Sequence, residues 1–456
     1  MKFQSADVVI CGAGIAGVAA AYYLALHHGI REVLLVDERA PLTLTSDKSS
    51  EGYRNWWPGP GKAMVQLMDR SIDLLEELAG EYGNSFHMNR RGYVYLTGDP
   101  ARASSMQEDA VEIARLGNDP LRFAEPYTLS PSQGYRDQPV GADLVLDPAV
   151  IQAAFPFITT DAVAMLHARR CGWLSAQQLG MILLEEAREA GVRLLNGRIT
   201  GVTIKSNRVE SVVIKTGNHS SRIVTRTFIN AAGPLVKQVG AWLGVDLPVY
   251  NELHGKIAFE DSLNVIPRDA PLMIWNDPIN LAWSEEEREE LAMFEETAWL
   301  LDEFPAGLHF RPEGGAGSQT LLLLWPYHTK ILEQPVWPVQ FEPEFVEIVV
   351  RGLTRMVPGM AVYLERMSRP YVDGGYYCKT QENRPLICPV PVSGAYVFGA
   401  LSGYGIMAAL AGAELLSAYV SDSDIPSYAP AFHLSRYDDP AYQILLRDWD
   451  AKAGQL

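Results

Sequence analysis

A glycine-rich turn between an apolar run and an apolar helix constrains the fold of this chain most. Residues 7–11 form a short apolar run, and Gly12-Ala-Gly14-Ile-Ala-Gly17 follows it at once. An alanine- and leucine-rich stretch covers residues 18–28, and residues 33–36 form a second apolar run that ends at Asp37. This order predicts a βαβ unit whose glycine-rich turn opens the helix.

The spacing of these glycines is typical of a turn that binds a pyrophosphate. Gly12 permits the tight turn, Gly14 lets the backbone approach the phosphates, and Gly17 lets the helix pack against the strand. The pyrophosphate then lies at the positive end of the helix. Asp37 stands where a carboxylate accepts hydrogen bonds from an adenosine ribose. The motif predicts a bound dinucleotide, but it does not separate FAD from NAD.

The composition excludes several other classes of protein. Lys and Arg total 38 against 55 Asp and Glu, which gives a net charge of −17 and disfavours a nonspecific nucleic-acid binder. The chain is 48% hydrophobic and 20% charged, so it can bury a packed core. Its four cysteines are far apart and form no CxxC pair, which indicates neither a disulfide framework nor a metal site. We therefore expect a cytoplasmic protein.

A second glycine-rich turn follows near the C-terminus. Residues 394–420 are long enough to cross a bilayer, but glycines interrupt their first half and Glu414 would be costly in a membrane. We therefore predict a buried strand at 395–398, a glycine turn and a buried helix at 406–420, with no transmembrane span. Residues 192–233 read as strands at 192–195, 201–205, 209–215 and 223–229. A second turn that opens a helix suits a long cofactor such as FAD.

Together these blocks resemble the D-amino-acid oxidase-like superfamily of FAD oxidoreductases, and within it the sarcosine and dimethylglycine oxidase and dehydrogenase branch. The matching blocks are the N-terminal fingerprint, the Ser/Thr-rich stretch 44–50, and segments 172–176, 231–233, 380–385 and 399–407. The resemblance implies a mixed α/β fold, with a Rossmann-type FAD-binding domain and an inserted, mainly antiparallel substrate domain. It implies an FAD-binding domain of residues 1–85, 148–245 and 369–430, a substrate domain of 86–147 and 246–368, and a C-terminal tail of 431–456.

The resemblance also assigns cofactor-binding residues. The ADP half of FAD would contact Gly12, Gly14, Ile15, Ala16, Gly17, Asp37 and Glu38. Ser49 and Ser50 fall where family hydroxyls meet the pyrophosphate and ribityl chain, and Val202 falls where a backbone amide meets adenine. Ala232 and Gly233 would pass near the nucleotide. The flavin would be bordered by Gly403, Tyr404, Gly405, Ile406 and Met407.

The residues that attach the flavin covalently in relatives are missing here. Family dehydrogenases carry a flavin-linking His just after the Ser/Thr-rich loop, where this chain has Glu51-Gly52-Tyr53. The oxidase branch uses a Cys whose place falls around Gly375, and Cys378 is out of register. The resemblance therefore implies noncovalent FAD.

The substrate contacts also depart from the family. Met407 occupies the place of a carboxylate-holding Lys, so sarcosine is expected to be a poor substrate. Arg54 and Lys256 are alternative cations, although each could be an ordinary ion-paired residue. An aromatic set could border an apolar or cationic amine, or it could be core packing. The candidate substrate contacts are Arg54, Trp56, Trp325, Tyr327 and His328.

The resemblance implies oxidation of a C–N bond of a secondary or tertiary amine or amino acid. Hydride would pass to the flavin, the imine would hydrolyse, and O₂ or another acceptor would reoxidise the cofactor. Tyr404, His254 and Lys256 are the candidate catalytic contacts. One alternative is a hydroxy-acid or polyol dehydrogenase of the same superfamily, with His254 or His328 as base.

A further alternative is a non-catalytic FAD-binding subunit or assembly factor, which would dock through the acidic residues 284–304. Ser284 and Glu287 predict a capping box there, and the apolar spacing predicts one amphipathic helix.

Overall fold

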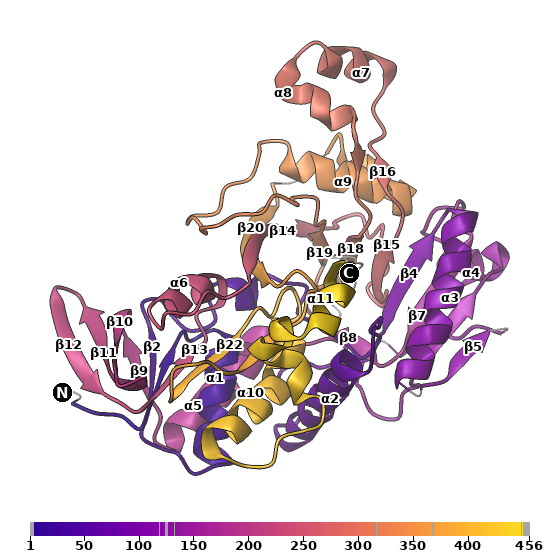
Figure 1. The fold of residues 1–456 in the computed structure, drawn as a ribbon. Helices are drawn as coiled ribbons and strands as arrows, with labels where there is room; N and C mark the ends of the chain where they lie inside the picture. The colour runs from indigo at the N-terminus through magenta and orange to yellow at the C-terminus, as the bar shows by residue number, and fades with distance from the viewer. Residues whose placement is uncertain are drawn as a thin grey trace.

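Two large β-sheets organise the chain. The computed structural model describes residues 4–117, 119–123, 126–131, 133–315, 317–366, 369–447 and 449. Within these residues, one sheet has six strands and the other has nine, and smaller sheets of two or three strands accompany them. In Figure 1 the six-stranded sheet and its helices fill the lower part of the molecule, and β14 to β20 lie above them. The predicted mixed α/β fold class is confirmed.

The six-stranded sheet contains the predicted βαβ unit. Its strand order is β21-β22-β13-β1-β2-β9, and all neighbours are parallel except the pair β21 and β22. The strands are β1 (Val8–Cys11), β2 (Val33–Asp37), β9 (Arg193–Asn196), β13 (Thr227–Asn230), β21 (Leu386–Pro389) and β22 (Ala395–Gly399). Side chains of β1 alternate between two cores, because Val8 and Ile10 join one cluster and Val9 joins another. Both faces of the sheet are thus covered, as parallel sheets require.

Helices cover one face of this sheet. They are α1 (Ile15–Leu26), α2 (Ala63–Glu81), α5 (Ala176–Glu189) and α10 (Gly405–Ser421). Glu414 lies in the otherwise apolar α10 and pairs with Arg70 of α2, with 2.6 Å between the charged atoms. Among the described helices, none is long and apolar enough to cross a membrane. The predicted strand, turn and buried helix near the C-terminus are confirmed.

A three-stranded sheet and α6 (Val236–Ala241) pack against the other face. The strands are β10 (Arg198–Lys205), β11 (Arg208–Thr216) and β12 (His219–Val224). The predicted strand at 223–229 divides here, because its first residues end β12 and its last ones belong to β13.

The nine-stranded sheet forms the second body of the fold. Its order is β20-β14-β19-β18-β15-β4-β7-β6-β5, and only the pairs β15 with β4 and β5 with β6 are parallel. The strands are β4 (Tyr93–Thr97), β5 (Leu121–Phe123), β6 (Ala142–Val145), β7 (Ala164–Ala168), β14 (Tyr250–Glu260), β15 (Leu272–Trp275), β18 (Leu308–Pro312), β19 (Thr320–Leu324) and β20 (Tyr371–Lys379). Strands β7 and β20 join this sheet although they fall in segments 148–245 and 369–430, which the resemblance gave to the FAD-binding domain. Helix α9 (Phe345–Met356) buries its apolar face against the sheet.

The acidic segment 284–304 is not one helix, so that prediction is wrong. It forms α7 (Glu285–Ala292), α8 (Glu295–Ala298) and the 3-10 turn η3 (Trp299–Leu301), and the predicted capping box of Ser284 and Glu287 is present. Phe294 has extended backbone angles, and its side chain is 57% exposed. Figure 1 shows α7 and α8 standing out beyond α9. Because none of the residues of α7 is buried, no packed surface favours a longer helix.

The C-terminal segment is fixed to the main body by a buried ion pair. Arg436 donates to the Glu382 carboxylate over 2.6 Å, and both residues are buried. Helix α11 (Pro440–Arg447) follows this contact. The pair holds the loop between β20 and β21, whose residue Asn383 borders the site described next.

Candidate active site

Three neighbouring cavities begin where β1, β2 and β13 end and reach to the nine-stranded sheet. The nucleotide cavity is lined by residues that include Gly12, Asp37, Glu38, Arg39, Ile199, Ala232, Trp242 and Trp337. The middle cavity is lined by residues that include Gly14, Ile15, Ala16, Thr45, Ser46, Ser49, Ala231, Gly233, Tyr376, Cys378, Ser402, Gly405 and Ile406. The inner cavity is lined by Ser50, Arg54, Tyr93, His254, Gly255, His309, Leu324, Trp325, Pro326, Tyr377, Asn383, Ser402, Gly403, Tyr404 and Met407.

Close backbone packing explains the glycines beside the nucleotide cavity. Gly12 has a φ of +106°, and a Cβ there would lie 2.4 Å from the carbonyl oxygen of Ala231. A Cβ on Gly17 would lie 1.9 Å from the carbonyl oxygen of Gly12. Any larger residue would therefore push the turn away from β13 or the helix away from the turn.

The Asp37 carboxylate is fixed at the end of β2. One oxygen accepts the backbone N–H of Ala13 over 2.8 Å, and the other accepts that of Arg39 over 2.9 Å. Each carboxylate oxygen has a second lone pair, so Asp37 can still accept from a ribose. Ile199 lines this cavity, whereas Val202, the expected adenine contact, lies three residues further along β10.

Two helix N-termini meet at the middle cavity. Helix α1 contributes Ile15 and Ala16, and α10 contributes Gly405 and Ile406. The first N–H groups of a helix have no partner within it, and together they attract negative charge. Ser46, in the Ser/Thr-rich loop, accepts the Ile15 N–H over 3.0 Å. This arrangement fits a pyrophosphate at α1 and an electron-accepting ring at α10.

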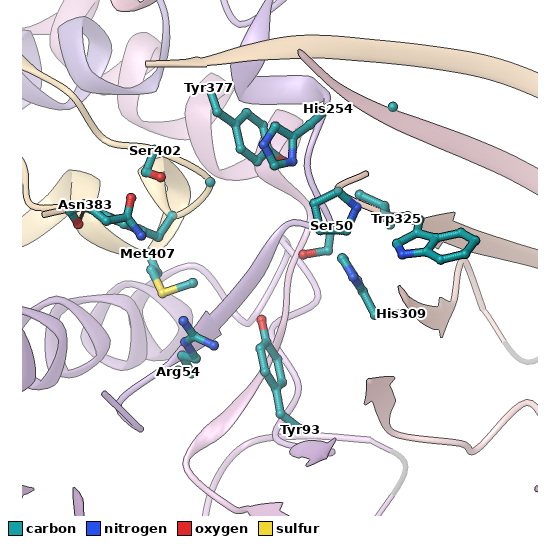
Figure 2. A pocket seen from close by; sticks show the side chains of 15 residues that line it. Ser50, Arg54, Tyr93, His254, His309, Trp325, Tyr377, Asn383, Ser402 and Met407 are labelled. Carbon is teal, nitrogen blue, oxygen red and sulfur yellow. Dashed lines mark hydrogen bonds between the residues drawn. The ribbon is translucent and has the colours of Figure 1, made fainter. Parts of the chain in front are cut away.

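Buried polar atoms of the inner cavity lack partners among the described residues. The Tyr93 hydroxyl and the Ser402 hydroxyl are buried without any hydrogen bond. Figure 2 shows the Tyr93 hydroxyl directed toward Ser50 and Arg54. A Cβ at residue 52 would lie only 1.8 Å from the Tyr93 hydroxyl, so Gly52 is what admits this tyrosine. Since unpaired buried hydroxyls are costly, they fit a site that a cofactor or substrate completes.

Arg54 gives the inner cavity a fixed positive charge. It ends β3 (Gly52–Arg54), is 4% exposed, and donates to the Tyr95 hydroxyl over 2.9 Å. Its guanidinium carbon lies 4.4 Å from the centre of the Trp57 ring. Among the described residues that line this cavity, none is Asp or Glu. An anionic group on a ligand would therefore be attracted to Arg54.

The two histidines of the inner cavity are neutral near pH 7. His254 stacks on Tyr377 with 3.9 Å between ring centres, and burial lowers its pKa to about 4. Burial likewise lowers the pKa of His309 to about 4. His309 Nδ1 lies 2.8 Å from the Gly307 carbonyl oxygen, which can only accept. Nδ1 therefore carries the proton, and Nε2 keeps a lone pair.

These histidines predict a loss of stability in mild acid. Their pKa values near 4 lie below the unfolded value of about 6.5, so the unfolded chain binds more protons between these pH values. The stabilisation is complete above pH 6.5 and falls as the pH approaches 4, by at most about 3 kcal/mol for each histidine. Urea unfolding at pH 7 and pH 5 measures this difference. His309→Gln should make the difference between the two pH values smaller, whereas His219→Gln, in exposed β12, should leave it unchanged. Equal urea midpoints for the parent at both pH values would contradict the prediction.

Some of the predicted substrate residues lie at the inner cavity and others do not. Arg54, Trp325 and His254 line it, together with Tyr404 and Met407. Trp56 is instead buried in a core with α3 (Pro100–Gly117) and β7. The Tyr327 hydroxyl bonds Glu342, and His328 Nε2 lies 3.0 Å from the same carboxylate. Lys256 donates to the Asp47 carbonyl over 2.6 Å, so it supports the Ser/Thr-rich loop.

Sequence reasoning missed several residues of the inner cavity. Tyr93 and His309 come from β4 and β18, and Tyr377 comes from β20. Asn383 and Ser402 come from the loops that follow. Tyr93, His309 and Tyr377 belong to none of the matched blocks. Asn383 lies in block 380–385 and Ser402 lies in the second glycine turn, and these positions were the available signals.

The comparisons with known proteins agree with this geometry. The family model described as FAD dependent oxidoreductase (DAO) matches residues 7–419. Dimethylglycine dehydrogenase from Rattus norvegicus is 26% identical over 273 residues, which is 59% of this chain and 28% of that protein. Sarcosine oxidase subunit beta from Rhodobacter capsulatus is 26% identical over 198 residues, which is 42% of this chain and 44% of that protein. The matches therefore span less than half the length of these relatives.

Solved structures share the fold over nearly the whole chain. L-proline dehydrogenase from P. horikoshii has a TM-score of 0.72 at 18% identity, with 96% of this chain and 98% of that one covered. Glycine oxidase from Geobacillus kaustophilus has a TM-score of 0.71 at 16% identity, with 95% and 99% covered. With the family model matched from the first β-strand into the last turns of α10, this chain belongs to the DAO family of FAD-dependent oxidoreductases.

Proposed function

We propose that the protein oxidises the C–N bond of a secondary or tertiary amine, and that the amine carries a carboxylate. The main support is the buried Arg54 side chain at the inner cavity, because a guanidinium donates well to a carboxylate. The relatives include proteins named for dimethylglycine and sarcosine, and the solved structures include proteins named for glycine and proline. All of these compounds are amines with a carboxylate.

The residues of the cavity would bind the amine in its reactive form. Arg54 holds the carboxylate, and Leu324, Trp325 and Tyr404 pack against the carbon groups. An ammonium is disfavoured, because most of the residues that line the cavity are buried and Arg54 is already a cation there. The amine is therefore neutral, with its lone pair available to expel a hydride. FAD, when bound, supplies the hydride acceptor, and the imine product hydrolyses after release.

The cofactor is proposed to be noncovalent. Cys378 lines the middle cavity, but burial raises the pKa of its thiol to about 12, so the thiolate that attacks a flavin is scarce. Glu51, in the stretch where family dehydrogenases carry a flavin-linking His, pairs with Arg311 over 3.2 Å. A Cβ at Gly375 would lie 3.0 Å from the side chain of Lys48, which leaves little space for a linking residue there.

The domain division is proposed along the two large sheets. The six-stranded sheet belongs to the FAD-binding domain of residues 1–85, 148–245 and 369–430. The substrate domain of residues 86–147 and 246–368 contributes most of the nine-stranded sheet, with β7 and β20 added from the FAD-binding segments. Residues 431–456 follow as a C-terminal tail.

The test is anaerobic reduction of the purified yellow protein. Acid precipitation should first release the flavin into the supernatant. The reduction rate per concentration is then compared for sarcosine, dimethylglycine, N-methyl amino acids of increasing size, amines without a carboxylate, and hydroxy acids. An amino acid bulkier than sarcosine should reduce the flavin fastest, since each buried methylene adds about 0.8 kcal/mol. Met407→Lys, tested beside the parent, should raise the reduction rate with sarcosine relative to the rates with the larger substrates.

Other outcomes would contradict specific parts of the proposal. If sarcosine reduces the flavin of the parent protein faster than every larger amine does, the argument from cavity size fails. Flavin that stays in the pellet contradicts the noncovalent cofactor. If no class of substrate reduces the flavin, the non-catalytic alternative gains support.

Oxidation of a hydroxy acid is the second candidate, and His309 is the observation that favours it. A hydroxyl must lose its proton when hydride leaves the adjacent carbon, so a neutral base is required. His309 lines the inner cavity, and its Nε2 keeps a lone pair. Of the two expected bases, His254 also lines this cavity, whereas His328 is paired with Glu342. Reduction by hydroxy acids alone in the same panel would replace the amine proposal.

A further inference from the structure

The segment between β19 and α9 leaves the nine-stranded sheet and reaches the cofactor cavities. We define its residues 331–337 as the strap. Figure 1 shows this part of the chain, in orange, extending past β20 before it returns to α9. The strap is far in sequence from β1 and β2, the two strands of the βαβ unit, and it belongs to none of the predicted cofactor-binding motifs.

Two anchors tie the strap to residues beside the middle cavity. Leu332 and Asn251 exchange backbone hydrogen bonds of 2.8 and 3.3 Å, and Asn251 Nδ2 donates to the Pro234 carbonyl over 3.1 Å. The Tyr376 hydroxyl donates to the Val336 carbonyl over 2.7 Å and accepts the Val336 N–H over 3.0 Å. Pro234 and Tyr376 both line the middle cavity. The anchors therefore fix where the end of the strap can lie.

The end of the strap places Trp337 in the wall of the nucleotide cavity. Trp337 lines this cavity with Asp37, Glu38 and Arg39. The Arg39 guanidinium carbon lies 5.0 Å from the centre of the Trp337 ring, and the ring meets Tyr376 edge-on with 5.5 Å between centres. The neighbouring Val336 side chain is 67% exposed. The strap therefore turns its tryptophan to the cavity and its valine to the solvent.

We propose that Trp337 is a cofactor-binding residue and that the strap closes the nucleotide cavity over the ADP half of FAD. Trp337 is half-buried where it lines the cavity, so a nucleotide there would cover more of the indole and bury apolar area. Arg39 and Tyr376 already restrict the ring, which lowers the entropy lost when a ligand packs against it. The proposal depends on FAD binding and on no particular substrate.

The experiment titrates apoprotein with FAD and, separately, with ADP. Trp337→Ala should raise the Kd for FAD about 10-fold to 100-fold, as truncation of an anchoring tryptophan does at interfaces. The Kd for ADP should rise by a similar factor, because Trp337 lies at the ADP end. Dissociation of FAD after dilution, followed by the return of flavin fluorescence, should be faster in the variant.

Matched variants separate this role from general damage. Trp337→Phe keeps an aromatic ring and should retain most of the affinity, whereas Val336→Ala changes only an exposed side chain and should match the parent. Tyr376→Phe removes the hydroxyl that anchors the strap and should weaken FAD binding less than Trp337→Ala. Thermal melting of each apoprotein checks the fold. Unchanged FAD and ADP affinities in a folded Trp337→Ala variant would overturn the proposal, even if amines reduce the parent as expected.

Discussion

Arg54→Met is expected to lower kcat/KM for amines that carry a carboxylate by about 30-fold or more. Arg54 is a buried cation at the inner cavity, and loss of one partner of a buried charge pair costs about 2 to 5 kcal/mol. Amines without a carboxylate do not use this charge, so their kcat/KM should change by much less. The ratio between the two classes of substrate is therefore the quantity to measure.

Two control variants make the Arg54 result specific. Arg54→Lys keeps the charge but loses the planar contact with Trp57 and the fixed bond to Tyr95, so an intermediate ratio is expected. Lys256→Met removes another cation, which bonds the Asp47 carbonyl in the Ser/Thr-rich loop, and should leave the ratio unchanged. The visible spectrum checks that each variant keeps its flavin. Equal losses for both substrate classes in Arg54→Met would show that the arginine supports the fold or the cofactor and does not bind a carboxylate.

The βαβ unit near the N-terminus could be predicted because its signals are local. A Cβ on Gly12 or Gly17 would lie 2.4 Å or less from a backbone carbonyl oxygen, and this requirement for glycine is visible in a few neighbouring residues. The same holds for the strand and glycine turn before α10. Val202 shows the limit of this reasoning. A strand can be recognised from its composition, but which of its residues faces a cavity depends on its register with β11.

The substrate half could not be predicted to the same depth, because its residues meet only in the folded sheet. Tyr93 and His309 lie on β4 and β18, which β15 separates. Trp56 and Trp57 are neighbours in sequence, yet Trp57 packs on Arg54 while Trp56 turns into another core. Tyr327 follows Trp325 by two residues, but its hydroxyl bonds Glu342 and Trp325 alone borders the cavity. Aromatic residues near a site in sequence are thus poor guides to those in contact with it.

The length of the acidic helix was mispredicted for a different reason. Apolar residues recur at helical spacing through 284–304, but spacing indicates a helix only if a surface buries those residues. Met293 and Phe294 are 73% and 57% exposed, and the helical structure is interrupted at these two residues, between α7 and α8. The capping box was predicted correctly because it depends only on Ser284 and Glu287, which are three residues apart.

Asp37→Ala is expected to weaken FAD binding by about 1.5 to 3 kcal/mol, the range for a charge-assisted hydrogen bond. This corresponds to an increase in Kd of about 10-fold to 150-fold. The carboxylate ends β2 at the nucleotide cavity, and its free lone pairs can accept the ribose hydroxyls. Its bond from the Ala13 N–H also holds the glycine turn, so the variant loses a ligand contact and part of the turn's support. Fluorescence titration of the apoprotein with FAD measures the change.

Conservative variants separate the two roles of Asp37. Asp37→Asn retains one side-chain oxygen for the Ala13 N–H but loses the charge, so its affinity for FAD should fall between those of the parent and Asp37→Ala. Glu32→Gln is the control, since the Glu32 side chain is 68% exposed, lies 3.1 Å from Arg193 and does not line the nucleotide cavity. A surface pair of this length contributes little, so this variant should bind FAD within about 3-fold of the parent. If Asp37→Ala retains FAD through dialysis as well as the parent does, the ribose contact lies elsewhere, and Glu38→Gln becomes the variant that should release it.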